Sequence, residues 1–248
     1  MTLDPGSLVA DLDLLEEIEK ATLRLVVQAM LEFRGHAALI FANDPDEPQD
    51  IGEDITREAM DRLGTSAIDV RLFGKVDYKR ARFVFQPEYS LRQALFVDSK
   101  AEAIAGAATA TIQMAQTSMR VRMQRAGTDM DEPGGLPTIV PAEAGTMLTT
   151  TVFVKFSYRE TPSPTGPIRE LVKITIAVLP NGLLQDRYNP SAAESFWLAG
   201  RNAYNNGETF RVRISFNRLK ALARWRVQEI RFDAEPAFAW DDDPPDSN

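Results

Sequence analysis

The sequence predicts an α/β fold, and three observations lead to this prediction. Helical patterns occupy roughly the first quarter of the 248 residues, and strand patterns prevail after residue 68. No flexible linker or internal repeat divides the chain. A chain of this length can also bury a substantial core. We therefore expect residues 1–248 to form one α/β domain, with a disordered acidic tail at residues 241–248.

Helical spacing of apolar residues is clearest at residues 12–33, where Asp11 is the candidate N-cap. A second, short helix is expected at "HAALIFA", residues 36–42. The proline- and acid-rich "NDPDEPQD" that follows predicts a loop. Residues 52–64 have acids at the start and glycine at the end, which is the usual polarity of a helix.

Short β-rich runs begin at residue 68. The segments 69–85 and 93–97 flank the turn "QPEYS" and predict a β-hairpin. Residues 101–119 are small, nearly uncharged and compatible with a helix, whereas the glycines and prolines of residues 127–145 predict a loop. Further strands are expected at residues 146–160, 168–179, 209–216 and 225–232, with a short helix at 217–223.

Composition excludes several classes of protein. The chain has no cysteine, which excludes disulfides and thiolate nucleophiles, and its single histidine, His36, excludes a multi-histidine metal site. We expect His36 to be a surface or helix-end residue. The N-terminus lacks the pattern of a signal peptide, and no segment is expected to reach the length of a membrane span. A cytoplasmic protein without membrane contact is the resulting expectation.

The formal net charge of -8 argues against a protein that coats nucleic acid non-specifically. A local basic surface is still compatible with this charge. Residues 201–226 contain seven basic residues and one acid, Glu208. This asymmetry indicates one face that meets a polyanion.

The tripeptide Asp98-Ser99-Lys100 ends the apolar run "ALFV" and raises the question of a metal-dependent nuclease. Hydrolysis of a phosphodiester needs a divalent cation on oxygen ligands, a positioned water and a nearby positive charge. The spacing of two places Asp98 and Lys100 on one face of a strand. About one acid-x-lysine match is expected by chance, and the chain has two, the other starting at Asp77.

The arrangement of the two matches favours Asp98, because Asp77 lies one hairpin earlier, where a partner carboxylate belongs. A solvated turn with surface ion pairs is the alternative. Glu53 could complete a metal site from the preceding helix, although acids are common in the first turn of helices for dipole reasons alone.

The segment "TFRVRIS" places Arg211 and Arg213 on one face of a strand, with Phe210, Val212 and Ile214 on the other. Two parallel guanidinium groups laid in a major groove could each bind a guanine. A pair of solvent-facing arginines is the alternative.

Taken together, these residues resemble the SfiI-type restriction endonucleases within the PD-(D/E)xK nuclease superfamily. The resemblance rests on segments that occur in the same order across most of residues 17–230. They are "EKATLRLVVQA", "EDIT", "VDYKRAR", "LFVDSKA", "VFVKFSYRE", "RYNP", parts of "SFWLAG", "RVRISFNRLK" and "WRVQE". The superfamily's proline is replaced by Val76, and residues 101–119 match poorly.

The resemblance implies a restriction-endonuclease-like core, in which a central mixed β-sheet is flanked by helices. By position, Asp77, Asp98, the Ser99 carbonyl and Glu53 would surround Mg²⁺, and Lys100 would assist the attacking water. Three arginines would bind DNA, namely Arg201, Arg211 and Arg213.

The implied activity is cleavage of double-stranded DNA at GGCCNNNNNGGCC, within the spacer, by a homotetramer or at least a dimer. A partner methyltransferase is also expected. Two alternatives remain: a nuclease of the same fold with another DNA target, and a catalytically silent, sequence-specific DNA-binding protein.

Overall fold

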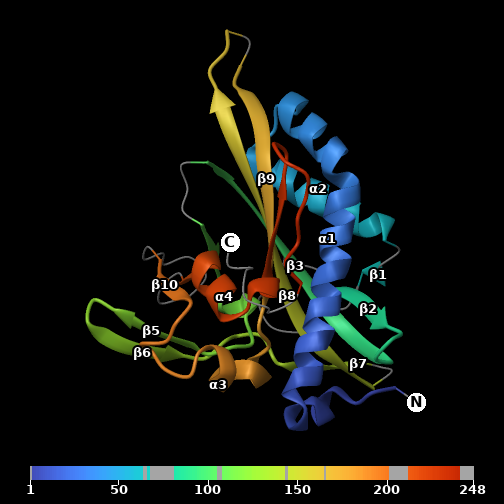
Figure 1. Cartoon of the computed structure of the whole chain (residues 1–248), viewed down its shortest axis with the longest axis vertical. Coiled ribbons are helices and arrows are strands. Elements are labelled where there is room, and N and C mark those ends of the chain that lie inside the picture. Colours follow the sequence, from blue (N-terminus) through green and yellow to red (C-terminus); the bar gives the residue numbers. More distant parts are fainter. Residues whose placement is uncertain are drawn as a thin grey trace, which may run out of the picture.

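A mixed β-sheet forms the centre of the computed structural model, which describes residues 2–63, 66–67, 81–104, 108–142, 145–164, 166–200 and 212–240. Within these residues the sheet has seven strands in the order β1-β2-β3-β8-β9-β12, with β7 pairing along β8 (Figure 1). β3 and β8 are parallel, and the other pairs are antiparallel. The strand bounds are β1 Ser66–Ala67, β2 Arg82–Gln86, β3 Leu91–Ala103, β7 Ile139–Ala142, β8 Gly145–Thr161, β9 Ile168–Leu179 and β12 Val227–Arg231.

Two helices cover one face of this sheet. α1 (Leu12–Asn43) packs along β9, and α2 (Pro48–Arg62) packs on β3. The predicted N-cap is confirmed, since Asp11 Oδ1 accepts a hydrogen bond from the Leu14 amide at 3.0 Å. The packing of α1 and α2 on the central sheet confirms the predicted mixed sheet with flanking helices.

The helix boundaries correct two predictions. The separate helix expected at residues 36–42 is the last part of α1, which continues past the exposed Gly35. The loop expected at residues 43–50 ends early, because α2 begins at Pro48, and proline is favoured in the first turn of a helix. His36 is exposed on α1 and stacks on Phe33, as expected for a surface residue.

α1 is long and apolar enough to cross a membrane by length and composition alone, so the expectation that no segment reaches that length is wrong. A helix that packs against a sheet meets the same test. Here Val26, Met30 and Phe33 of α1 belong to the buried core beside the sheet.

Two smaller sheets stand beside the central one. The first has the order β10 (Trp197–Ala199), β11 (Val212–Ser215) and β4 (Thr109–Ile112) and is followed by α4 (Phe216–Leu222). The second pairs β5 (Val121–Arg125) with β6 (Thr128–Glu132). The strands predicted at residues 146–160 and 168–179 are confirmed as β8 and β9.

Strand pairing overturns two predictions, at residues 101–119 and 127–145. The described part of the first segment is not one helix. It begins in β3, its Ala110 and Ile112 are buried where β4 pairs with β11, and only Met114–Gln116 form a short 3₁₀ helix. The second contains β6 and β7 rather than a loop alone. Ala126 and Gly127 both have positive φ between β5 and β6, which is the backbone of a tight hairpin turn. In each case pairing with another strand decided the structure of a segment with weak local preference.

Candidate active site

Asp98 lies within β3 and is buried, with only 2% of its surface exposed. Lys100 Nζ is 2.9 Å from Asp98 Oδ2. β3 continues to Ala103, so the alternative of a solvated turn is wrong. A carboxylate held inside a sheet with an ammonium group beside it is the arrangement that the nuclease hypothesis requires.

The register of the sheet places Asp98 and Lys100 on the face opposite α1 and α2. Ser99 Oγ donates a hydrogen bond to Thr56 Oγ1 of α2 at 2.7 Å, so odd-numbered residues of this part of β3 face the helices. Side chains alternate along a strand. Asp98 and Lys100 therefore point to the other face, together with Glu102.

Gln49 of α2 holds the backbone of β3 next to Asp98. Its Nε2 donates to the Ser99 carbonyl at 2.9 Å, and its Oε1 accepts from the Ala101 amide at 3.1 Å. The amide of Gln49 thus takes the hydrogen-bonding positions that a neighbouring strand would use. Nε2 also donates to Glu53 Oε1 at 2.8 Å, one helical turn later.

Through Gln49, the exposed carboxylate of Glu53 is brought to the edge of β3 near the Ser99 carbonyl. The Glu53 carboxylate and the Ser99 carbonyl offer hard oxygen ligands, which suit Mg²⁺. No cluster of three or more metal-binding side chains is present among the residues that the structure describes. Asp77 lies outside those residues, so its predicted place in the site remains a prediction.

Arg213 lies on β11 with the expected alternation, because its neighbours Val212 and Ile214 are fully buried while Arg213 is half-buried. Its Nη2 donates a hydrogen bond to Thr109 Oγ1 across the small sheet. Arg201 and Arg211 lie outside the described residues. The guanine-binding role of all three arginines therefore remains a prediction.

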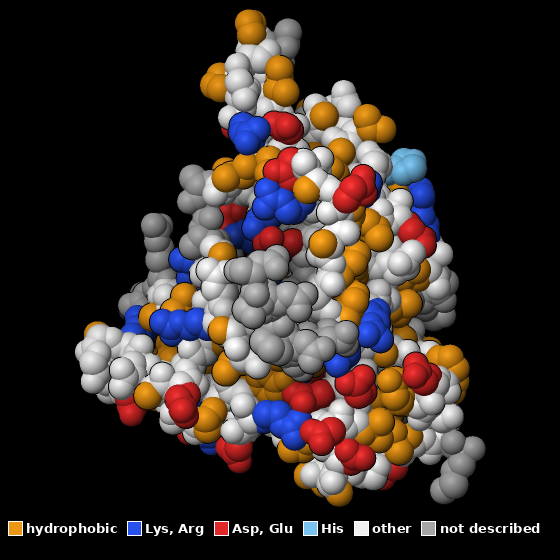
Figure 2. Space-filling view, viewed as in Figure 1, with side chains coloured by type: hydrophobic (Ala, Val, Ile, Leu, Met, Phe, Trp, Pro, Cys, Tyr) orange, Lys and Arg blue, Asp and Glu red, His pale blue; other side chains and the backbone are white. Residues whose placement is uncertain are grey.

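Among the described residues of the basic segment near the C-terminus, at least one arginine does not lie on the surface. Arg226 is fully buried and pairs with Glu19 at 2.8 Å, and Arg218 donates to the Ser195 carbonyl at 3.0 Å. Figure 2 likewise shows basic and acidic side chains interspersed on the face in view. The expectation of one polyanion-binding face is wrong for Arg226, because a buried guanidinium cannot meet DNA.

Sequence reasoning missed Gln49, Glu102 and Lys155. Gln49 precedes Glu53 by four residues, the spacing at which helical side chains meet, but this signal was hidden because the sequence predicted a loop up to residue 50. Lys155 is the neighbour of Lys100 in the register of β8 and β3, and its Nζ contacts Glu102 Oε2. That contact depends on strand pairing and has no signature in the local sequence.

Comparison with known proteins identifies the family of the chain. The family model of the type II restriction enzyme SfiI matches residues 23–230. The type II restriction enzyme SfiI of Streptomyces fimbriatus is 36% identical over 238 residues, which is 92% of this chain and 88% of the relative.

Solved structures give the same result. A crystal structure of tetrameric restriction endonuclease SfiI bound to cognate DNA has a TM-score of 0.80 and 34% identity over 95% of this chain and 91% of that chain. The restriction endonuclease BglI bound to its DNA recognition sequence has a TM-score of 0.75 over 93% of this chain and 95% of that chain, at 17% identity, which shows the fold alone. The chain belongs to the SfiI family of type II restriction enzymes, which are site-specific deoxyribonucleases.

Proposed function

We propose that this restriction enzyme hydrolyses double-stranded DNA in a magnesium-dependent reaction at GGCCNNNNNGGCC, within the spacer, and leaves 3′ overhangs. The observation that carries the proposal is the buried Asp98 with Lys100 at 2.9 Å on the central strand β3. The family membership supports the same activity.

In the proposed site, Asp98, the Ser99 carbonyl, Glu53 and Asp77 hold the metal ion. When bound, magnesium supplies positive charge that stabilises the developing charge on the scissile phosphate. The Lys100 ammonium orients the attacking water beside Asp98. Gln49 keeps the Ser99 carbonyl and the Glu53 carboxylate at the same edge of β3. In-line attack by water then leaves 5′-phosphate and 3′-hydroxyl ends.

Recognition of the half-sites is assigned to Arg211 and Arg213 in the major groove, with Arg201 as an additional DNA contact. Two parallel guanidinium groups suit two neighbouring guanines, since each can bind O6 and N7 of one base. Symmetric cleavage of a palindrome requires at least a dimer. The SfiI relative is described as tetrameric and bound to cognate DNA, which supports a tetramer here. We expect the enzyme to act on DNA in the cytoplasm.

Run-off sequencing of digested DNA of known sequence tests activity, target and cut position together. We expect fragments that end inside the spacer of GGCCNNNNNGGCC and only when magnesium is present. Cleavage at another interrupted palindrome would retain the nuclease and correct its target. Intact DNA under conditions in which a control enzyme cuts, together with sequence-selective binding, would identify a catalytically silent DNA-binding protein instead.

A further inference from the structure

Two lysines lie side by side on the face of the sheet that carries Asp98. Lys100 of β3 and Lys155 of β8 are register partners on neighbouring parallel strands. Such strands are about 4.8 Å apart, and paired residues point to the same face. A lysine side chain is long enough for either ammonium group to approach the Asp98 carboxylate. The surrounding acids therefore decide which of the two does so.

Lys155 is the more buried of the two lysines. Its side chain is 6% exposed, whereas that of Lys100 is 29% exposed. A buried ammonium group is costly unless acceptors surround it. Lys155 Nζ donates to Glu102 Oε2 and, at 2.9 Å, to the Thr109 carbonyl.

Glu102 follows Lys100 by two residues and so shares its face of β3. The order of charges on this face of β3 is Asp98, Lys100, Glu102. Lys100 turns toward Asp98, and Lys155 is held by Glu102, which lies four residues beyond Asp98. If Glu102 lost its charge, the buried ammonium of Lys155 would lose this carboxylate, and the carboxylate of Asp98 lies on the same face.

We propose that Glu102 is a positioning residue that holds the Lys155 ammonium away from Asp98 and keeps that carboxylate available to the divalent cation. This inference rests on the proposed metal-dependent reaction. It extends the site from β3 to β8, because the charge of the Lys155 ammonium on β8 affects the Asp98 carboxylate on β3.

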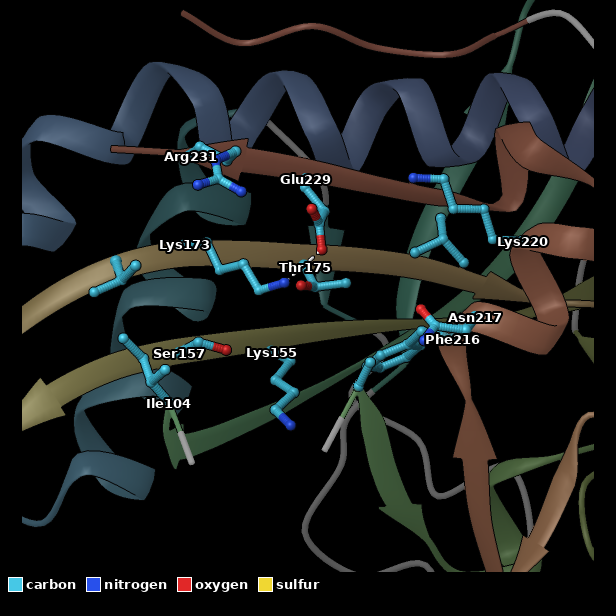
Figure 3. Close-up of a pocket in the computed structure, with 13 residues that line it drawn as sticks. Ile104, Lys155, Ser157, Lys173, Thr175, Phe216, Asn217, Lys220, Glu229 and Arg231 are labelled. Carbon is cyan, nitrogen blue, oxygen red and sulfur yellow. Dashed lines mark hydrogen bonds and ion pairs between the residues drawn. The ribbon is translucent and has the colours of Figure 1, made fainter. Parts of the chain in front are cut away.

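The same face offers a matched control pair on the next strands. Lys173 of β9 and Glu229 of β12 form an ion pair of 2.6 Å with both side chains 32% exposed. Figure 3 shows Lys155, Lys173 and Glu229 around a cavity of about 380 Å³ between the sheet and α4. Loss of Glu229 would leave Lys173 with access to water, and β8 separates its strand from Asp98.

The test compares Glu102→Gln, Lys155→Met and the double variant with the control Glu229→Gln. Two measurements are made. A magnesium titration of cleavage gives the concentration for half-maximal cleavage and the maximal rate, and calorimetry without DNA gives the affinity for Mn²⁺. For Glu102→Gln we expect about a tenfold or greater increase in the magnesium requirement and a matching loss of Mn²⁺ affinity. Charges a few ångström apart interact by at least that much in a partly buried site.

Lys155→Met should bind metal like the wild type, because the half-exposed Glu102 that it leaves can be hydrated. The double variant should regain the metal affinity that Glu102→Gln lost, since the competing ammonium is gone. Glu229→Gln should leave both quantities unchanged. A purely structural role for Glu102 predicts no such recovery in the double variant.

The proposal is wrong if Glu102→Gln binds Mn²⁺ like the wild type, or if the double variant remains as impaired as Glu102→Gln. If Glu102→Gln fails to fold, the variant Glu102→Asp is tested in its place, because aspartate keeps the negative charge on a shorter side chain. Metal affinity near that of the wild type supports the proposal, and a loss as large as in a metal-ligand variant such as Asp98→Ala overturns it. A wild-type protein that binds Mn²⁺ but cuts no DNA would refute the proposed function and leave this comparison valid.

Discussion

Replacing Arg226 with methionine removes a buried cation that joins the C-terminal segment to α1. Arg226 and Glu19 are both fully buried, and Arg226 Nη1 lies 2.8 Å from Glu19 Oε2. The Asn181 amide donates to the other carboxylate oxygen at 2.7 Å. The guanidinium also lies over the rings of Tyr188 and Trp225, at 4.1 and 4.3 Å from their centres. The variant would leave Glu19 in the core without its cation.

Removal of one partner from a buried ion pair costs about 3–5 kcal/mol of unfolding free energy, because the other charge stays buried. For a chain of this size that corresponds to a decrease in melting temperature of about 6–20 °C. Burial already raises the pKa of Glu19 above its ordinary value of 4.5, and Arg226 opposes this shift. Without Arg226 the pKa of Glu19 should rise further.

The pH dependence of this loss of stability follows from the direction in which folding shifts the pKa of Glu19. An acid whose pKa is higher in the folded state destabilises the fold above its unfolded pKa and has no such effect below it. The stability difference between wild type and Arg226→Met should therefore shrink as the pH falls toward 4.5. Both proteins must be compared at each pH, since other carboxylates also titrate in this range.

Thermal and denaturant unfolding measure the effect, with two comparisons. The half-exposed pair of Lys173 and Glu229 is the control, and Lys173→Met should cost about 0–1 kcal/mol. The double variant Glu19→Gln/Arg226→Met should recover part of the loss, because the buried charge is removed. The reasoning fails if Arg226→Met costs no more than Lys173→Met, or if the double variant is no more stable than Arg226→Met.

Three further predictions concern the site. Asp98→Ala should abolish cutting while DNA binding survives in a mobility-shift assay, and full activity would exclude Asp98 as a metal ligand. Gln49→Met loses the hydrogen bonds to Ser99 and Ala101. At about 1 kcal/mol per bond we expect a loss of about 2 kcal/mol in unfolding free energy, together with slower cleavage. Wild-type stability and a wild-type cleavage rate would show that Gln49 does not position this edge of β3. Arg213→Ala should lower selectivity for one guanine by about 1–3 kcal/mol, measured by competition between substituted sites, and an even loss over all sequences would indicate a phosphate contact instead.

The parts of the fold that the sequence predicts well are those with a strong local period. α1 shows helical spacing over many turns, and β8 and β9 are long runs rich in β-branched and aromatic residues, so their type was predictable without knowledge of their partners. β4 lacked such a signal, because its small residues form a strand only through pairing with β11. The predicted break in α1 before residue 36 had no physical basis in the fold, since one exposed glycine does not end a helix that has the buried Phe33 and Ala37 on either side of it.

At the proposed site, the sequence predicts the residues that we assign to catalysis but not those that hold them in place. Asp98 and Lys100 could be named because their spacing along one strand defines a shared face. Glu102 has the same spacing from Lys100, yet its importance depends on Lys155, which is 53 residues away in sequence. Only the parallel register of β3 and β8 sets the two lysines side by side and makes the position of Glu102 matter. Residues that balance charge across strands therefore follow from register, and a single sequence does not determine register between distant parallel strands.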